Sequence, residues 1–489
     1  MVIINNSFSF ILTLYILLDL KQCAVYLPFK ISYSYENKQD FNSTDVLNYW
    51  KSPKINSELM IGSPPQKMCV SFVSNIYELN LFQSNCDCEG SSYNKESSES
   101  YNFLKNINYM YNKILNCSII NETLYLYTDQ EQKNKLTFEG MNIIYSDNIK
   151  EEFKPDSDKQ TQYEYHSNTC LNIGFLGQPS ISFGYDLNLN FVRQLKNYQK
   201  NKNSFATSYD WTLKFTSAEE GFLIIGQKPH EFDNNNYKEE QYLTAGSKNN
   251  RYTHEWFLEV DSIYYTGIRE NNNSAYNSSF YDDSSIKLYI NYGLIEGTKN
   301  YEENIKKDFF NKLFEGKQCF FDQINEYRFY YCNKDSFNYI KKYFPALKFC
   351  FKQHGMCFEF TYDDLFKEKN DKLFFLIYFN DKNSFSRYTV GLILLKKYLI
   401  TFNYDTKLIG FYNKNIPINS TETGNENENN KSNGFFLYFI VIILFILFLV
   451  IGFLLGKKIY ENTRKKRANE LLDDDYEYKS GTIDNKNIN

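Results

Sequence analysis

Side chains that could do chemistry are sparse in this sequence and form none of the common catalytic patterns. None of the histidines stands in H-E-x-x-H or in another spacing that binds zinc. They are His166, His230, His254 and His354. The chain contains no G-x-S-x-G nucleophile elbow and no Walker or dinucleotide glycine loop. Cys86-Asp87-Cys88 matches neither a thioredoxin C-x-x-C nor a zinc ribbon. We therefore expect no metal and no cofactor.

One acidic segment, Asp282-Asp283-Ser284-Ser285, could supply a catalytic carboxylate, but only with a partner from elsewhere in the chain. The simpler interpretation is an acidic loop beside the glycosylation sequon at Asn277. Asp87, between two cysteines, is expected in a loop on a disulfide-held turn.

A stronger pattern begins at Met60, where the chain reads MIGSPPQKMCVSFVSNIYELNLFQSNCDC. This segment resembles the opening of pepsin-like aspartic proteases, which read I-G-T-P-P-Q, then a strand, then F-D-T-G-S-S-N-L-W-V and a cysteine. Ile61 to Gln66 match, and the 13 residues between Phe72 and Cys86 let the two patterns align without a gap.

Further segments resemble the same family in the same order. They are NIGFLGQPSISF with Gly174 and Gly177, the helix-like NFVRQLKN, the strand GFLIIG, the strand WFLEVDSIYYTG and the closing VGLILLKKYLITFNYDTKLIGFYN. The resemblance covers about residues 61 to 413. It implies a mostly β, bilobal pepsin-like acid-protease fold.

The residues that make this family catalytic are missing at the matching positions. The family uses two aspartates, one from each lobe, that share a proton across a bound water. Here the alignment puts Val73 at the first position, followed by Ser74 and Asn75. In SIKLYINYGLIEG, aligned on Gly293 and Gly297, the second position is Tyr289, followed by Ile290 and Asn291.

Neither replacement can do the chemistry of the aspartates. A valine neither accepts a proton nor bears charge, and a tyrosine with an ordinary pKa near 10 is a poor acid–base group at acidic or neutral pH. The flap motif Y-G-x-G-S is matched to residues 127–131, with Tyr127 as the flap tyrosine and with both glycines lost. A hairpin tip without glycine must be built differently.

The patterning agrees with a β-rich ectodomain. Alternating runs at 136–145, 221–226, 256–265 and 397–412 predict strands, and the runs at 190–200, 300–314 and 336–344 predict helices. About 410 residues exceed the size that one hydrophobic core usually serves, so two lobes are expected. We divide the region into a lead-in at 25–59, lobe one at 60–230 and lobe two at 231–413.

Both ends of the chain indicate a type I membrane protein of the secretory pathway. Residues 1–24 have an apolar core and Ala24 near the expected cut site of a signal peptide, although an uncleaved anchor is the alternative. A polar stalk at 414–434 precedes the uncharged apolar run 435–456, which is long enough to span a bilayer. Basic residues open the segment 457–489, which predicts a cytosolic tail. In this tail, Leu471-Leu472 or Tyr476 could form part of a sorting signal.

Cysteines and sequons fit a lumenal domain. Most cysteines beyond the signal region are expected in disulfides, and a hairpin could place Cys350 opposite Cys357. The candidates are Cys69, Cys86, Cys88, Cys117, Cys170, Cys319, Cys332, Cys350 and Cys357. Sequons indicate glycosylated surface loops. They start at Asn42, Asn116, Asn121, Asn272, Asn277, Asn419 and Asn430.

Three functions remain open. The sequence favours a catalytically inactive ectodomain that binds a peptide or protein in the cleft between its lobes. The alternatives are an active membrane-bound endopeptidase with unrecognised aspartates, and a surface scaffold or adhesion protein. The net charge of −5 is spread out with no basic face, which argues against nucleic acid as a partner.

Overall fold

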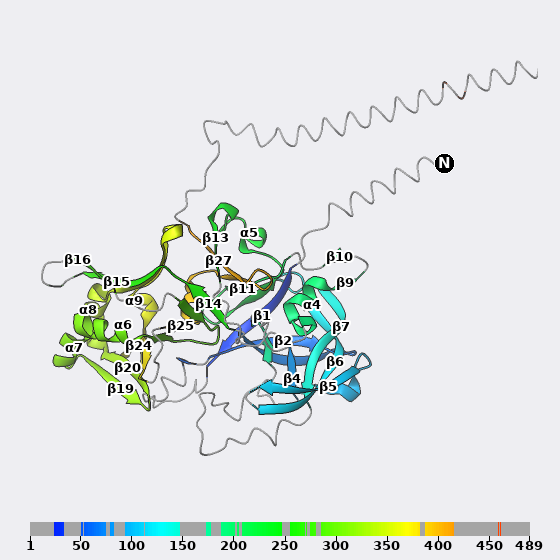
Figure 1. The fold of residues 1–489 in the computed structure, drawn as a ribbon, viewed down its shortest axis with the longest axis horizontal. Helices are drawn as coiled ribbons and strands as arrows, with labels where there is room; N and C mark the ends of the chain where they lie inside the picture. The colour runs from blue at the N-terminus through cyan, green and yellow to red at the C-terminus, as the bar shows by residue number, and fades with distance from the viewer. Residues whose placement is uncertain are drawn as a thin grey trace, which may run out of the picture. The chain divides into compact units, whose positions relative to one another are not determined.

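The fold of the chain is given by a computed structural model (Figure 1). The structure describes residues 24–33, 50–51, 53–74, 79–82, 93–111, 113–146, 173–177, 187–200, 203–204, 208–246, 255–268, 270, 274–279, 285–381, 387–414, 458 and 460. The chain divides into a compact unit, Met1–Pro417, and a second unit, Ile418–Asn489. Among the described residues, no helix is long and apolar enough to cross a membrane. The signal region before Ala24, most of the stalk and the apolar run 435–456 lie outside them.

The largest sheet combines strands from the first half of the chain with the last two strands of the first unit (Figure 1). Its described strands run in the order β13-β27-β26-β11-β12-β1-β2-β3-β8-β4-β7-β6-β5. Their bounds are β1 Val25–Ser32, β2 Lys54–Ile61, β3 Gln66–Val73, β4 Asn80–Phe82, β5 Asn102–Tyr111, β6 Lys113–Tyr127, β7 Lys135–Ser146, β8 Ile173–Phe175, β11 Asp210–Phe215, β12 Glu220–Ile225, β13 Tyr242–Gly246, β26 Thr401–Asn403 and β27 Leu408–Tyr412. A short pair, β9 (Gln199–Lys200) and β10 (Asn203–Ser204), stands apart.

The second lobe has a mixed sheet in the order β14-β17-β25-β18-β24-β20-β19, with β23 also on β24, and a smaller sheet in the order β16-β15-β21-β22. The bounds of these strands are β14 Trp256–Glu259, β15 Ser262–Ile268, β16 Ala275–Ser279, β17 Ser285–Leu288, β18 Ile295–Gly297, β19 Cys319–Ile324, β20 Tyr327–Asn333, β21 Ala346–Phe351, β22 Met356–Phe360, β23 Phe366–Lys369, β24 Lys372–Asn380 and β25 Tyr388–Val390.

Helices in the described residues are short. The α-helices are α4 Phe191–Asn197, α5 Pro229–Phe232, α6 Lys299–Ile305, α7 Asn311–Glu315, α8 Phe337–Tyr343, α9 Tyr362–Leu365 and α10 Leu392–Lys397. Single turns are η1 Lys95–Ser97, η2 Leu187–Leu189, η3 Glu239–Gln241, η5 Lys334–Ser336 and η6 Lys352–His354, together with the π-helical turn η4 Lys306–Phe310.

Burial patterns explain why these segments are strands. In β2, buried residues alternate with more exposed ones, as expected of a strand with one face in the core. By contrast, β24 is buried along seven consecutive residues because it lies in the middle of the lobe-two sheet, between β18 and β20. Helix starts are also encoded locally, since the Asn190 side chain accepts a hydrogen bond from Arg193 N (2.7 Å) at the start of α4.

The predicted strands at 136–145, 221–226, 256–265 and 397–412 are confirmed as β7, β12, β14 with β15, and β26 with β27. The predicted helices are confirmed as α4, α6 to α7, and α8, although the π-helical turn η4 interrupts the second of them. The segment interpreted as a lead-in carries β1 and most of β2, so it is part of the largest sheet. β26 and β27 belong to that sheet too, so the division at residue 230 does not separate the sheets.

Candidate functional site at the junction of the lobes

The two lobes present equivalent strand ends to each other. In lobe one, β3 runs parallel to β8 and ends at Val73, whose carbonyl accepts a hydrogen bond from Leu176 N (3.1 Å). In lobe two, β17 runs parallel to β25, and Tyr289 N, immediately after β17, donates to Val390 O (2.9 Å). Val73 and Tyr289 therefore hold corresponding places in the two lobes.

Hydrogen bonds between side chain and backbone join these two strand ends across the lobes. Ile290 N donates to the Ser74 hydroxyl oxygen (3.2 Å), and Asn291 Nδ2 donates to Phe72 O (2.7 Å). Ser74, Ile290 and Asn291 are buried. The residues that follow Val73 and Tyr289 are thus held directly against each other.

This junction has little capacity for acid–base chemistry in the residues that the structure describes. Within 71–74 and 285–298 the acidic residue is Glu296. Its carboxylate accepts hydrogen bonds from Thr389 Oγ1 (3.3 Å) and Asn380 Nδ2 (3.4 Å). A shared-proton reaction needs two carboxylates that face one water, and these segments do not offer such a pair.

A cluster of tyrosine side chains lies on the lobe-two side of the junction. The ring of Tyr289 packs edge-on against Tyr292 at 5.7 Å between centroids, and the hydroxyls of Tyr292 and Tyr378 are hydrogen-bonded. The ring of Tyr327 packs edge-on against Tyr378 at 5.6 Å. Burial raises the pKa of Tyr292 and Tyr378 well above the usual value. These two phenols therefore stay neutral at physiological pH.

A segment from the N-terminal region packs against these tyrosines. We call it the strap, and it comprises Trp50, Lys51 and Pro53, just before β2. Gly293 N donates to Lys51 O (3.3 Å), and the Trp50 ring lies 5.5 Å from Phe374 between centroids and is buried. The Lys51 ammonium lies 3.8 Å from the ring centroid of Tyr327.

Sequence reasoning did not single out the strap. The one sequence signal available was an aromatic residue beside a basic one immediately before a strand, which is too common a pattern to carry a prediction.

The structure places the flap candidate Tyr127 beside β1. Tyr127 is the last residue of β6, where it pairs with Tyr26 of β1 and Lys135 of β7. The hairpin tip is closed by the Asp129 carboxylate, which accepts from Lys133 N (3.0 Å) and Asn134 N (2.6 Å), and Gln132 takes a positive φ of 57°. In this tip a glutamine therefore takes the positive φ that glycine usually provides, and the Asp129 carboxylate holds the backbone in place through its hydrogen bonds.

A longer hairpin, β5–β6, reverses direction between Tyr111 and Lys113 and was not assigned from the sequence. It is a second candidate for the flap. The run of alternating residues in β5 and β6 was the signal that could have found it.

Other candidate residues are partly described. Lobe two contains the disulfides Cys319–Cys332 and Cys350–Cys357, and the second confirms the pairing expected of the hairpin. Cys69 is disulfide-bonded and Cys117 is buried in β6. Outside the described residues lie Asn75, Cys86, Asp87, Cys88, Cys170, Asp282, Asp283 and the sequons at Asn42, Asn272, Asn419 and Asn430.

The remaining sequons lie in strands rather than in loops. Asn116 and Asn121 are in β6, between β5 and β7, and the Asn121 Oδ1 atom is buried. Asn277 is in β16, an edge strand, and is exposed. In the part of the chain that the structure describes, no three His, Cys, Asp or Glu side chains gather as a metal site would require.

The sheets, their order and the junction define a mostly β, two-lobed fold of the pepsin-like kind. No protein-family model matches the chain, and no curated protein matches its sequence. Solved structures do match, and three of them illustrate the similarity.

Basic 7S globulin from soybean is 13% identical with a TM-score of 0.50, and the match covers 81% of this chain and 98% of the globulin. Conglutin gamma, a basic 7S globulin from lupine seeds, is 9% identical with a TM-score of 0.54, over 80% and 95% of the two chains. The protein edgp is 10% identical with a TM-score of 0.51, again over 80% and 95%. Similarity at such low identity shows the fold alone.

Proposed function

We propose that this chain is a membrane-anchored protein of the secretory pathway whose pepsin-like ectodomain binds a peptide or protein segment between its lobes without cutting it. The observation that carries the proposal is the junction itself. Val73 and Tyr289 hold corresponding strand ends, and the described segments around them, 71–74 and 285–298, lack a pair of carboxylates. Their neighbours Ser74 and Asn291 bind across the lobes instead.

Binding without cleavage fits the rest of the lobe architecture. A pepsin-like fold presents strands on both sides of its lobe junction, and an extended peptide can add to such strands through backbone hydrogen bonds. Two of the three solved structures described above that share this fold carry the names of globulins. Anchoring is supported by the apolar run 435–456 and the basic residues after it.

The experiment is a paired assay on the full-length chain in detergent micelles. A mixed peptide library is incubated with the protein from pH 3 to 7, with and without a transition-state inhibitor of aspartic proteases. Mass spectrometry then measures cleaved peptides and retained intact peptides. We expect no inhibitor-sensitive cleavage and the retention of a subset of peptides.

Two variants locate the binding surface. Val73→Trp adds bulk at the half-buried end of β3 and should reduce retention, whereas Glu139→Trp adds the same bulk at an exposed position of β7 and should not. Cleavage blocked by the inhibitor would replace the proposal with an active protease. A folded protein that retains no peptide would leave the scaffold function.

A further inference from the structure

The Lys51 ammonium is held by aromatic rings of lobe two. It lies 3.8 Å from the ring centroid of Tyr327 and 5.3 Å from that of Tyr378. Both distances fall within the range at which the ring quadrupole attracts a cation. We call the faces of Tyr327 and Tyr378 the tyrosine site.

The site is neutral in its rings and negative in its surroundings. Burial, followed by the charges of the Glu326 and Glu296 carboxylates, raises the pKa of Tyr327 to about 12. A phenol that stays protonated attracts a cation through its ring face, and the same nearby carboxylates that disfavour the phenolate favour a positive guest. Both features select a basic side chain rather than an acidic or apolar one.

The walls of the site are built independently of the strap. Tyr327 begins β20 and pairs with Asn380 of β24, while Tyr378 lies within β24 opposite Phe329. The Tyr378 hydroxyl is also bonded to Tyr292. These contacts come from lobe two, so the rings would keep their places if the Lys51 side chain left.

The strap, by contrast, is positioned by a close approach to one glycine. A Cβ atom at Gly293 would lie 2.1 Å from Trp50 O and 3.2 Å from Pro53 Cγ. No side chain larger than hydrogen can therefore occupy position 293 while the strap stays where it is. The φ of Gly293 is not positive, so the requirement is for space and not for backbone conformation.

We propose that the tyrosine site is a recognition site for a basic side chain, and that Lys51 is an internal occupant that a lysine or arginine of a ligand must displace. The inference rests on the proposed binding function and adds to it the chemistry of one ligand residue. The Tyr292 ring contacts both Tyr289 and Tyr378, so the tyrosine site adjoins the junction at which the proposed peptide would lie.

The test removes the internal occupant and measures binding of a small cation. The full-length chain in detergent micelles is titrated with N-acetyl-lysine methylamide and with tetramethylammonium, and binding is followed by calorimetry. Lys51→Ala should bind both probes at least about fivefold more tightly than wild type, the effect of one cation–π contact. Lys67→Ala, which removes an exposed lysine paired with Glu58 in lobe one, should bind as wild type does.

Two further variants test the walls and the strap. Adding Tyr327→Leu to Lys51→Ala keeps much of the side-chain volume but removes the ring, and it should abolish the gain. Gly293→Ala keeps Lys51 but displaces the strap, and it should give the same gain with a red shift of Trp50 fluorescence. Circular dichroism confirms that each variant is folded.

The outcomes separate this inference from the proposed function. If Lys51→Ala gains no affinity, or if it keeps its gain after Tyr327→Leu, the tyrosine site is not a cation site, even where wild type retains library peptides. If Lys51→Ala binds the small cations but no variant retains peptides, the site stands and the peptide-binding function fails.

Discussion

At the scale of single residues, the junction shows what motif comparison can and cannot predict. Comparing motifs predicted that Val73 and Tyr289 stand where the family that the chain resembles has its aspartates, and the structure places both at the ends of corresponding strands. It did not predict that Ser74 and Asn291 bind across the lobes, because a hydrogen bond between residues 216 positions apart has no local signature. The polar character of both residues close after Val73 and Tyr289 was the available hint.

Ser74 should matter for stability although it does no chemistry. Replacing it with alanine leaves the buried Ile290 N without its acceptor, which costs about 1–3 kcal/mol. We expect Ser74→Ala to lower the midpoint of guanidinium unfolding accordingly. Ser74→Thr keeps the hydroxyl and should stay close to wild type, and equal stability of the two variants would show that this hydrogen bond contributes little.

The flap illustrates a different limit of sequence comparison. Tyr127 was chosen because a tyrosine followed by polar residues resembled a flap tip. The pairing of Tyr127 with Tyr26 and Lys135 depends on which strands become neighbours, which a short motif does not encode.

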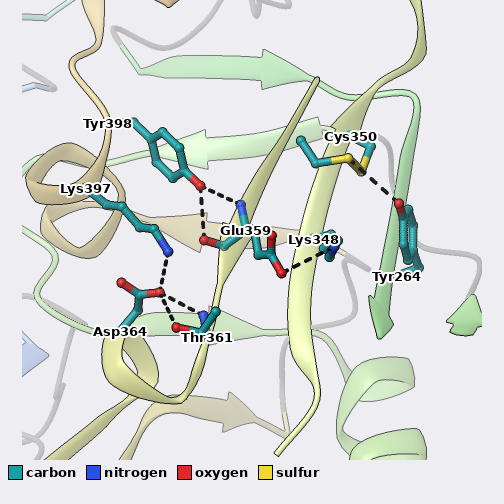
Figure 2. A network of polar contacts seen from close by, with 9 residues as sticks. Tyr264, Lys348, Cys350, Glu359, Thr361, Asp364, Lys397 and Tyr398 are labelled. Atoms are coloured by element: carbon teal, nitrogen blue, oxygen red, sulfur yellow. Dashed lines mark hydrogen bonds and ion pairs between the residues drawn. A yellow bond between two sulfur atoms is a disulfide. The ribbon is translucent and has the colours of Figure 1, made fainter. Parts of the chain in front are cut away.

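At the scale of elements, lobe two is tied together by hairpins with polar and covalent cross-links. Figure 2 shows the β21–β22 hairpin, in which Cys350 and Cys357 face each other in register and are bonded. The Tyr398 hydroxyl accepts from Glu359 N (2.7 Å) and donates to Glu359 O (3.1 Å). Lys397 Nζ pairs with the Asp364 carboxylate (2.6 Å), which also accepts from Thr361 N.

The other disulfide-bonded hairpin, β19–β20, is packed less tightly against the rest of lobe two. β19 is the edge strand of its sheet, and Phe320 and Phe321 on it are exposed. The Cys319–Cys332 disulfide closes a longer loop, 13 residues against 7, so it restricts the unfolded chain more.

We therefore expect the variant Cys319→Ala/Cys332→Ala to lose about 2–3 kcal/mol of stability, somewhat more than Cys350→Ala/Cys357→Ala. Limited proteolysis should cut the first variant within β19 before any other described strand. A variant that unfolds at the same denaturant concentration as wild type would mean that β19 is held by its side chains alone.

Most elements could be predicted because their periodicity is local. The strands at 136–145 and 221–226 alternate or are bounded by glycine, and the helix at 190–200 begins at an asparagine that caps it. β1 could not be assigned, since its role depends on β12 pairing with it from nearly 200 residues away. The sequons at Asn116 and Asn121 were expected in loops for a different reason: a sequon indicates a surface site but carries no information on strand pairing, and here their strand partners, Asn108, Asn102 and Asn142, lie in the neighbouring hairpin strands.

At the scale of the whole molecule, three aromatic side chains connect the lobe-two sheet that begins with β14 to the largest sheet. Trp211 of β11 stacks on Phe402 of β26 at 4.1 Å between centroids and meets Trp256 edge-on at 6.2 Å. Trp256 opens lobe two, yet its indole Nε1 donates to Leu176 O of lobe one (2.9 Å). All three side chains are buried, so neither lobe completes its core alone.

Trp256→Phe tests this connection because it keeps an aromatic ring but removes the indole donor. Leaving Leu176 O without its partner should cost about 1–3 kcal/mol. In differential scanning calorimetry we expect the unfolding transition to shift down and to broaden as the lobes lose coupling. Tyr330→Phe, which removes a buried hydrogen bond to the Glu302 carboxylate within lobe two (2.7 Å), is the matched control and should leave the width of the transition unchanged.

The largest sheet also sets the order in which the protein can be completed during synthesis. β1 is the first of the described strands to be made, but its neighbour β12 follows nearly 200 residues later, and the row beyond β12 and β11 is finished by β26 and β27. An early strand with an unpaired edge is prone to pair wrongly with other chains. A nascent chain must therefore keep one edge of β1 shielded until Ile225 has been made, and one edge of β11 shielded until Thr401–Asn403 has been made.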